Sequence, residues 1–253
     1  MKGLAAATGV LAGGLQAAPS TRPNILYLHS HDTGRYIQPY GYAVPTPNLQ
    51  KLASEGFLFR QAFDAAPTCS PSRAALLTGQ CPHQNGMLGL AHRGFSLNDY
   101  KRHLLHWLRP HGYRSTLIGV QHIAKQAATI GYDEVVATNG VHVAQVAPAA
   151  RNFLKRAPAQ PFFLDVGFFE THREFHNPGP KEDPRFTEPP ATVADTPLTR
   201  RDMAAFHASA RVLDEGVGTV LDALESAGLA QNTLVISTTD HGISFPGMKC
   251  NLT

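Results

Sequence analysis

Short apolar runs of strand length recur along the 253 residues of this chain and alternate with segments of helical character. Runs of this length with few polar side chains favour strands over core helices. Such strands are typical of parallel sheets, because helices cover both faces of the sheet. We therefore predict an α/β fold with a mixed, largely parallel sheet flanked by helices on both faces. The predicted strands span residues 24–30, 114–119, 161–169 and 233–237.

Helix signals fill the intervals between these strands. Thr46 and Pro47 have the residue types of an N-cap and a first helical position, and Gly56 ends that helix. A long amphipathic helix is predicted to start at a capping box over 199–202 and to end at Gly228. Further helices are predicted at 74–78, 97–109 and 148–156, and an extended piece at 57–63.

Composition narrows the class of protein. Apolar residues make up 43% of the chain and charged residues 16%, as in an ordinary globular protein, and the net charge of +3 is too small to indicate nucleic-acid binding. No uninterrupted apolar run is long enough for a membrane span. Residues 1–19 carry one lysine followed by an alanine-, glycine- and leucine-rich stretch, which predicts a signal peptide and export; the alternative is a disordered N-terminus. Residues 20–253 are predicted to form one domain.

Three cysteines are too few, and odd in number, for a disulfide framework. Cys69 opens the stretch Cys69-Ser70-Pro71-Ser72-Arg73, just ahead of the helix predicted at 74–78. Free N–H groups at a helix start and a nearby arginine both lower a thiol pKa, so we expect an acidic thiol at Cys69. A proline turn with an unreactive cysteine, or a disulfide between Cys69 and Cys81, is the alternative.

Groups capable of chemistry follow each predicted strand. They are His31 and Asp32, His122, His172, and Asp240 with His241. Because ligands bind beyond the carboxyl ends of parallel strands, we expect these groups to meet at one edge of the sheet. Asp32, Asp240 and His241 suit a divalent metal, and carboxylate oxygens favour a hard cation such as Ca²⁺ or Mg²⁺. His31 is either a further ligand or a supporting group beside the ligands.

Cationic and proton-transferring side chains accompany this predicted metal site. They are Arg73, His122, His172 and Lys249. Cations and a metal neutralise the oxygens of an anionic tetrahedral ester, while a histidine protonates the leaving group. The residues alone therefore indicate a metal hydrolase acting on phosphate or sulfate esters.

The stretch Cys69-Ser70-Pro71-Ser72-Arg73, followed by Leu77-Thr78-Gly79, resembles the sulfatase signature C-x-P-x-R…T-G. The first strand with Asp32, and the turn Asp240-His241-Gly242, resemble the two metal-binding segments of that family. The resemblance covers residues 22–253 and is strongest to the sulfamidase branch. The stretches that carry this likeness are CSPSRAALLTG, HQNGM at 83–87, PFFL at 161–164, His172-Arg173, and Gly242-Ile243 with Phe245-Pro246.

The resemblance implies that a maturation enzyme converts Cys69 to formylglycine, whose hydrate is the nucleophile and a metal ligand. It implies that Arg73 holds the hydrate and that His122 assists the release of sulfate. His172 and Lys249 would bind sulfate or protonate the leaving group. The implied metal is Ca²⁺, with Mg²⁺ or Mn²⁺ as alternatives, held by Asp32, Cys69, Asp240 and His241. The implied substrates are sulfate esters or N-sulfate groups on glycosaminoglycan-type sugars.

Departures from the family pattern leave other functions open. His31-Asp32 stands where the family usually has paired acids, and His122 lacks the lysine that commonly precedes it in a G-K-x-H stretch. Asp240-His241 replaces Asp-Asn, as in related phosphonate and phosphodiester hydrolases. Sulfatases also continue well beyond the position of Thr253, so we expect a truncated chain. A phosphonate or phosphodiester hydrolase and a non-catalytic remnant are therefore the alternatives.

Overall fold

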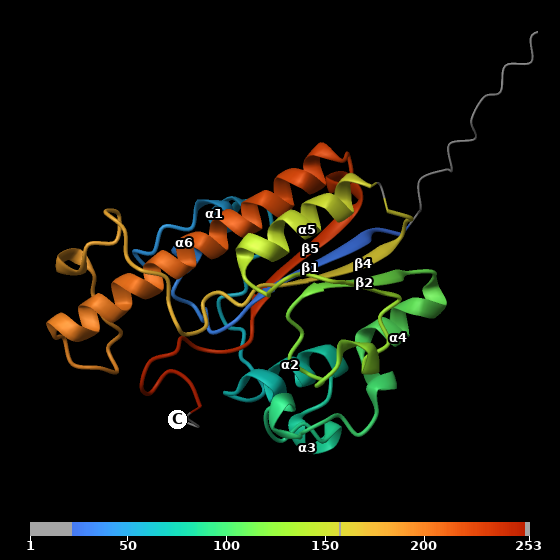
Figure 1. Ribbon diagram of the computed structural model, residues 1–253, viewed down its shortest axis with the longest axis horizontal. Helices are drawn as coiled ribbons and strands as arrows, with labels where there is room; N and C mark the ends of the chain where they lie inside the picture. The colour runs from blue at the N-terminus through green and yellow to red at the C-terminus, as the bar shows by residue number, and fades with distance from the viewer. Residues whose placement is uncertain (1–21, 157, 251–253) are drawn as a thin grey trace, which may run out of the picture.

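The computed structural model describes residues 22–156 and 158–250 (Figure 1). The predicted signal peptide, residues 1–19, lies outside them. Five strands form one sheet in the order β3-β2-β4-β1-β5, and every neighbouring pair is parallel. The strands are β1 (Asn24–Ser30), β2 (Arg114–Gly119), β3 (Glu134–Val136), β4 (Phe162–Gly167) and β5 (Thr233–Thr239). The predicted α/β fold is confirmed, with a described sheet that is parallel throughout.

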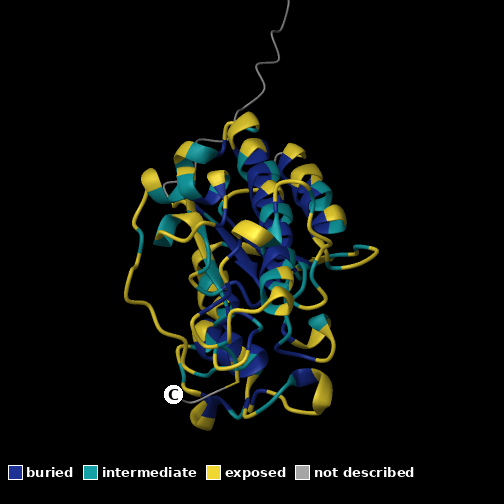
Figure 2. Ribbon diagram, turned by 90° about the vertical axis from the view of Figure 1, so that its left-hand side faces the viewer, coloured by how far each residue is buried: buried dark blue, intermediate teal, exposed yellow. Residues whose placement is uncertain are grey.

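Helices cover both faces of this sheet (Figure 1). The helices are α1 (Pro47–Ser54), α2 (Cys69–Thr78), α3 (Pro82–Asn85), α4 (Leu104–Leu108), α5 (Val143–Lys155) and α6 (Pro197–Ser226). In Figure 1, α1, α5 and α6 lie on one side of the sheet, and α2, α3 and α4 lie on the other. Figure 2 shows the buried strands enclosed between helices whose outer surfaces are exposed.

Alternation along the strands divides the core into two layers. On β1, Leu26 and Leu28 belong to the apolar cluster shared with α5 and α6, whereas Tyr27 belongs to the cluster on the α2 side. On β4, Leu164 faces the first cluster and Phe163 the second. Successive side chains of a strand point to opposite faces, so a strand buried on both faces must be apolar at nearly every position.

Two predicted helix starts lie too far along the chain. Helix α2 begins at Cys69 rather than at residue 74, because Pro71 falls in the first turn, where backbone N–H groups have no partner within the helix. Helix α5 begins at Val143, so Pro148, the predicted first residue of this helix, lies in its interior.

Other local predictions are wrong in detail. The predicted capping box is displaced: Thr196 and Thr199 form it, with Pro197 at the first helical position of α6. Only Leu104–Leu108 of the predicted 97–109 helix is α-helical, and short 3₁₀ turns flank it. Residues 57–63 form no strand. Strand β3 was not predicted, because three residues at a sheet edge carry little pattern.

The start of α1 is capped from another helix. Thr46 is the N-cap residue as predicted, but its side chain makes no capping bond. The buried carboxylate of Asp214 on α6 accepts hydrogen bonds from the N–H groups of Asn48 and Leu49 at 3.1 and 2.8 Å, and from the Asn48 side chain at 2.9 Å. Asp214 therefore satisfies N–H groups that a helix start leaves unpaired.

All three cysteines are free, so the Cys69–Cys81 disulfide is absent. Within residues 22–156 and 158–250, no helix combines the length and apolar character needed to cross a bilayer.

Replacing Asp214 by Ala should lower the free energy of unfolding by about 1–3 kcal/mol, because it leaves buried N–H groups of α1 without an acceptor. Chemical denaturation measures the change. Asp222→Ala is the matched control, since Asp222 is exposed on the same helix. Equal destabilisation by the two substitutions would contradict the capping role of Asp214.

Candidate active site at the carboxyl edge of the sheet

The two acids that follow β1 and β5 meet beyond the ends of these neighbouring strands. The backbone N–H of Asp32 donates to the Asp240 carboxylate at 2.8 Å. Cys69, the first residue of α2, places its Sγ atom 3.2 Å from Nε2 of His241. The parallel sheet and the start of α2 thus bring together groups that are far apart in the sequence.

The potential ligand atoms form one compact group. One donor atom each from His31, Asp32, Cys69 and Asp240 lies within 4.8 Å of the others, and all four residues are buried. His241 Nε2 lies 3.4 Å from an Asp32 oxygen and 3.7 Å from an Asp240 oxygen.

Several of these donor atoms make no hydrogen bond. Among the described residues, both ring nitrogens of His31 and the Oδ1 atom of Asp32 are buried without a hydrogen bond. His31 Nδ1 lies 3.1 Å from an Asp240 oxygen without the alignment of a hydrogen bond. Burial lowers the pKa of His31 well below its usual value, so its imidazole is neutral and able to coordinate. Buried polar atoms normally have partners, so this donor set fits a divalent cation.

Arg73 holds the Asp240 carboxylate in place. Its Nε and Nη2 atoms donate to one Asp240 oxygen at 3.1 and 3.0 Å, and Nη2 also donates to the Ser30 carbonyl at 2.7 Å. Burial alone would raise the pKa of Asp240, but the Arg73 charge, together with His31 and His241, holds that pKa well below the usual value.

Lys249 reaches the site from the last described segment of the chain. Its Nζ atom donates to Asp32 Oδ2 at 2.5 Å. Burial alone would lower the pKa of Lys249, but the Asp32 carboxylate raises it overall, so the amine stays protonated. Gly242 permits this approach, because a Cβ atom there would lie 2.0 Å from the carbonyl oxygen of Met248.

His122 and His172 flank the group. Their rings lie 5.5 and 5.6 Å from the ring of His31. His122 Nε2 lies 2.9 Å from Nδ1 of His92. Burial, aided by the Arg73 charge, lowers the pKa of His122 to about 4, so this imidazole is neutral near pH 7. His172 Nδ1 contacts the Arg173 carbonyl oxygen at 2.5 Å, which leaves its Nε2 atom for other partners.

Two of these residues adopt an unusual backbone conformation. Asp32 and His122 have φ angles of 53° and 58°, in the left-handed region that residues other than glycine rarely occupy. Strain of this kind costs about 1–3 kcal/mol per residue and concentrates at functional sites.

The prediction of an acidic thiol at Cys69 is wrong for the unmodified residue. Burial, reinforced by the Asp240 carboxylate, raises the pKa of Cys69 to about 12. The charges of Lys249 and Arg73 act to lower it, but burial and the carboxylates outweigh them, and the Arg73 guanidinium pairs with Asp240. Cys69 is therefore a neutral thiol here, and its place among the candidate functional residues rests on its position rather than on its acidity.

Two serines of the Cys69-Ser70-Pro71-Ser72-Arg73 stretch hold the start of α2 against the strand ends, a role that the sequence did not reveal. Ser70 donates to the His122 carbonyl and Ser72 to the Asp240 carbonyl, each at 2.5 Å. The sequence feature that could have indicated this role is the presence of two serines beside a predicted helix start.

A buried polar chain behind Arg73 was also missed. Arg73 Nη1 donates to His29 Nδ1 at 2.5 Å, so the proton of that ring is on Nε2, which donates to Asp165 at 2.8 Å. The Tyr132 hydroxyl donates to the other Asp165 oxygen at 2.5 Å. An aspartate within the apolar run 161–169 was the sequence signal for this chain.

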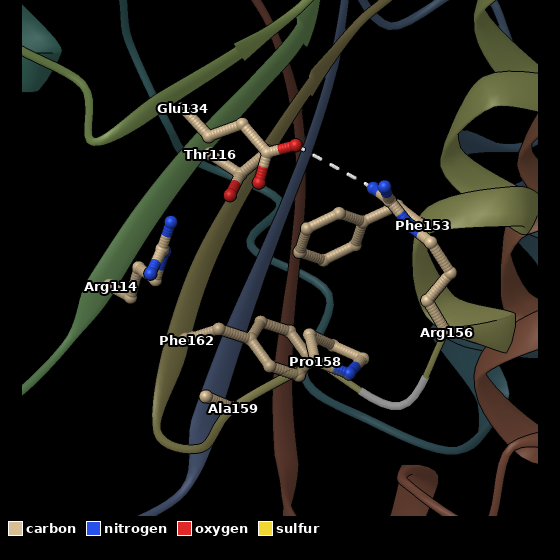
Figure 3. Close-up of a pocket in the computed structure, with 8 residues that line it drawn as sticks. All are labelled: Arg114, Thr116, Glu134, Phe153, Arg156, Pro158, Ala159 and Phe162. Carbon is tan, nitrogen blue, oxygen red and sulfur yellow. Dashed lines mark ion pairs between the residues drawn. The ribbon is translucent and has the colours of Figure 1, made fainter.

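An open cavity lies at the opposite edge of the sheet (Figure 3). Its lining includes Arg114, Glu134 and Phe162, the first residues of β2, β3 and β4. Glu134 pairs with Arg156 across it at 3.6 Å. Because it opens at the amino ends of the strands, this cavity is separate from the candidate active site.

Comparison with known proteins defines the class to which this fold and site belong. The profile of the Sulfatase family matches residues 23–251, so the chain belongs to the sulfatase family.

Two curated relatives of this chain are named a sulphohydrolase and a sulfatase. Human N-sulphoglucosamine sulphohydrolase is 35% identical over 90% of this chain and 52% of that protein. An ulvan-active sulfatase of Formosa agariphila is 30% identical over 90% of this chain and 45% of its own length. A crystal structure of a candidate sulfatase from Bacteroides fragilis shares the fold, with a TM-score of 0.74, 24% identity, and coverage of 91% of this chain and 64% of that one. The chain spans about half the length of the curated relatives it matches.

Gly242→Ala should destabilise the protein by about 1–3 kcal/mol, because the added methyl group cannot fit against the Met248 carbonyl and must push the Lys249 segment away from Asp32. Thermal or chemical unfolding measures the loss. Gly56→Ala is the control, since its Cβ would meet only the Leu52 carbonyl oxygen at 3.4 Å. If both variants were as stable as the parent, the close approach would not constrain the site.

Proposed function

We propose that the cluster around Cys69 is the catalytic centre of a sulfatase that uses a formylglycine nucleophile and a divalent metal. The observation that carries this proposal is the position of the Cys69 side chain. It opens a helix inside the C-x-P-x-R stretch and lies in one buried group with His31, Asp32 and Asp240. Neither a turn cysteine nor a purely structural thiol requires two buried carboxylates beside it.

The charges of the site suit an anionic substrate. Two carboxylates, Asp32 and Asp240, are balanced by the two cations Arg73 and Lys249. A divalent cation would therefore give the site a net positive charge, which favours a sulfate or sulfamate group and opposes a neutral ester.

Asp32, Asp240 and His241 would hold the metal together with modified Cys69, and beside them both ring nitrogens of His31 lack a hydrogen bond. The carboxylate oxygens favour Ca²⁺, and they also suit Mg²⁺ or Mn²⁺. When present, formylglycine and the metal supply a hydrated aldehyde as nucleophile and a Lewis acid that polarises the sulfate oxygens. A maturation enzyme is required, because the side chain of Cys69 must lose its sulfur.

The protein side chains take the remaining roles. Arg73, held by its ion pair with Asp240, orients the modified residue. Neutral His122 is able to accept a proton during sulfate release, consistent with its lowered pKa. Lys249 remains protonated and binds a substrate oxygen, and His172 binds sulfate or protonates the leaving group.

N-sulfated or O-sulfated sugars of the glycosaminoglycan type are the proposed substrates. The support is the 35% identity to an N-sulphoglucosamine sulphohydrolase. We also propose export, from the signal-like residues 1–19. A phosphonate or phosphodiester hydrolase is the second candidate, because the imidazole of His241 stands beside Asp32 in the site. Hydrolysis rates on matched sulfamate, sulfate and phosphate substrates separate these functions.

Cys69→Ala should abolish hydrolysis of an N-sulfated or O-sulfated glucosamine while leaving the far-ultraviolet circular dichroism spectrum unchanged, because it removes the nucleophile precursor from an intact site. Cys81→Ala is the control, since Cys81 is exposed outside the cluster, and it should retain most activity. Intact-mass measurement should show loss of sulfur at Cys69 in the active parent. Substantial turnover by Cys69→Ala would refute the mechanism; a parent that keeps its thiol and has no activity would indicate the non-catalytic remnant.

Asp32→Asn should weaken Ca²⁺ binding at least about tenfold, because even groups that only support metal ligands contribute 10–100-fold to affinity. Isothermal titration of the folded chain measures the affinity. Asp99→Asn changes the same charge at an exposed position near α4 and should bind Ca²⁺ like the parent. Equal affinities for all three proteins would show that Asp32 is not a ligand.

A further inference from the structure

A second cluster of potential metal ligands lies outside the candidate catalytic centre. His142, Glu170 and His176 each contribute a donor atom, and the three atoms lie within 4.8 Å of one another. His142 Nδ1 lies 3.0 Å and His176 Nε2 lies 3.4 Å from the same oxygen of Glu170. No role in sulfate hydrolysis described above uses these three residues.

The distances from the Glu170 oxygen to the two imidazole nitrogens match a tetrahedral metal site. A Zn²⁺ ion with ligands at about 2.0–2.1 Å places neighbouring ligand atoms about 3.3 Å apart. The observed separations of 3.0 and 3.4 Å lie on either side of that value. Two imidazoles and one carboxylate form a donor set that prefers Zn²⁺ over Ca²⁺ or Mg²⁺.

Each ligand is held by a different part of the fold. His142 is the N-cap residue of α5, and the second oxygen of Glu170 accepts the N–H of Val143 at 3.0 Å. The backbone N–H of His176 donates to Ser209 on α6 at 2.8 Å. Glu170 is 3% exposed, so its carboxyl group is buried in contact with two imidazoles. Such anchoring orients metal ligands in advance.

We propose that His142, Glu170 and His176 form a second metal site, which binds Zn²⁺ with solvent as the fourth ligand. The two histidine side chains are half-exposed, which gives the ion an entry path and leaves room for water.

The position of this site relates it to the catalytic centre. The ring of Phe169 packs edge-on against His142 at 5.2 Å and stacks on His172 at 4.6 Å. The backbone of Glu170 accepts the N–H of His31 at 3.1 Å. A bound ion therefore joins the end of β4 to α5, and fixes the segment that carries His172.

The experiment compares zinc content in a Cys69→Ala background, which lacks the thiol of the catalytic centre. After equilibrium dialysis against micromolar Zn²⁺ in excess Ca²⁺, elemental analysis should find one fewer zinc per chain when His142→Ala and His176→Ala are added. The matched control, His83→Ala with His111→Ala, removes two exposed histidines elsewhere and should lose none. Cobalt bound in place of zinc should give the visible absorption bands of a tetrahedral site, without a thiolate charge-transfer band. These bands should disappear when His142→Ala and His176→Ala are added, and should remain in the control.

Glu170→Gln keeps an oxygen acceptor for Val143 and removes the charge, so it should weaken zinc binding at least about tenfold while leaving the unfolding midpoint in chelator unchanged. Equal zinc content in the His142/His176 variant and its control would overturn the proposal, and would leave the cluster as a hydrogen-bonded pair of imidazoles on a carboxylate. Because the background is inactive by design, this result is independent of the proposed hydrolase activity.

Discussion

The buried ion pair between Arg73 and Asp240 is the contact on which the rest of the site depends. It joins the start of α2 to the end of β5, and both charged side chains are nearly inaccessible to solvent. Breaking a buried pair by removing one partner costs about 3–5 kcal/mol, because the remaining charge is left without compensation. The pair is therefore a strong constraint on where the Cys69-bearing helix can start relative to the sheet.

Asp240 transmits this constraint to the other site residues. While one of its oxygens pairs with Arg73, the other accepts the N–H groups of Asp32 and His241 at 2.8 and 3.0 Å. On its far side, Arg73 rests on the chain formed by His29 and Asp165. The orientation of the two candidate metal-binding acids is thus set by hydrogen bonds that reach from the centre of the sheet.

The sequence predicts the parts of this structure that depend on local pattern. Four of the strands appear as apolar runs, and the parallel sheet follows from their alternation with helices. The start of α2 and the short strand β3 could not be placed, because a proline in a first turn and a three-residue edge strand carry no periodicity. The thiol pKa of Cys69 was predicted in the wrong direction, because burial and the neighbouring Asp240 carboxylate raise it, and neither leaves a trace in the local sequence. The cluster of His142, Glu170 and His176 could not be predicted either, because these residues come together only in the folded chain.

The arrangement of this site also depends on close backbone contacts at the ends of the strands. A Cβ atom on Gly167 would lie 2.0 Å from the Val120 carbonyl, and one on Gly242 would lie equally close to that of Met248. These two glycines let the His122 and Lys249 segments pass directly over the ends of β4 and β5 toward the candidate metal-binding group. A larger side chain at either glycine would push the neighbouring segment, and with it His122 or Lys249, outward while leaving the acids in place. The carboxylates would then lose the positive charge of Lys249, which balances them together with Arg73 among the described contacts, so the proposed catalytic centre would attract an anionic ester less strongly.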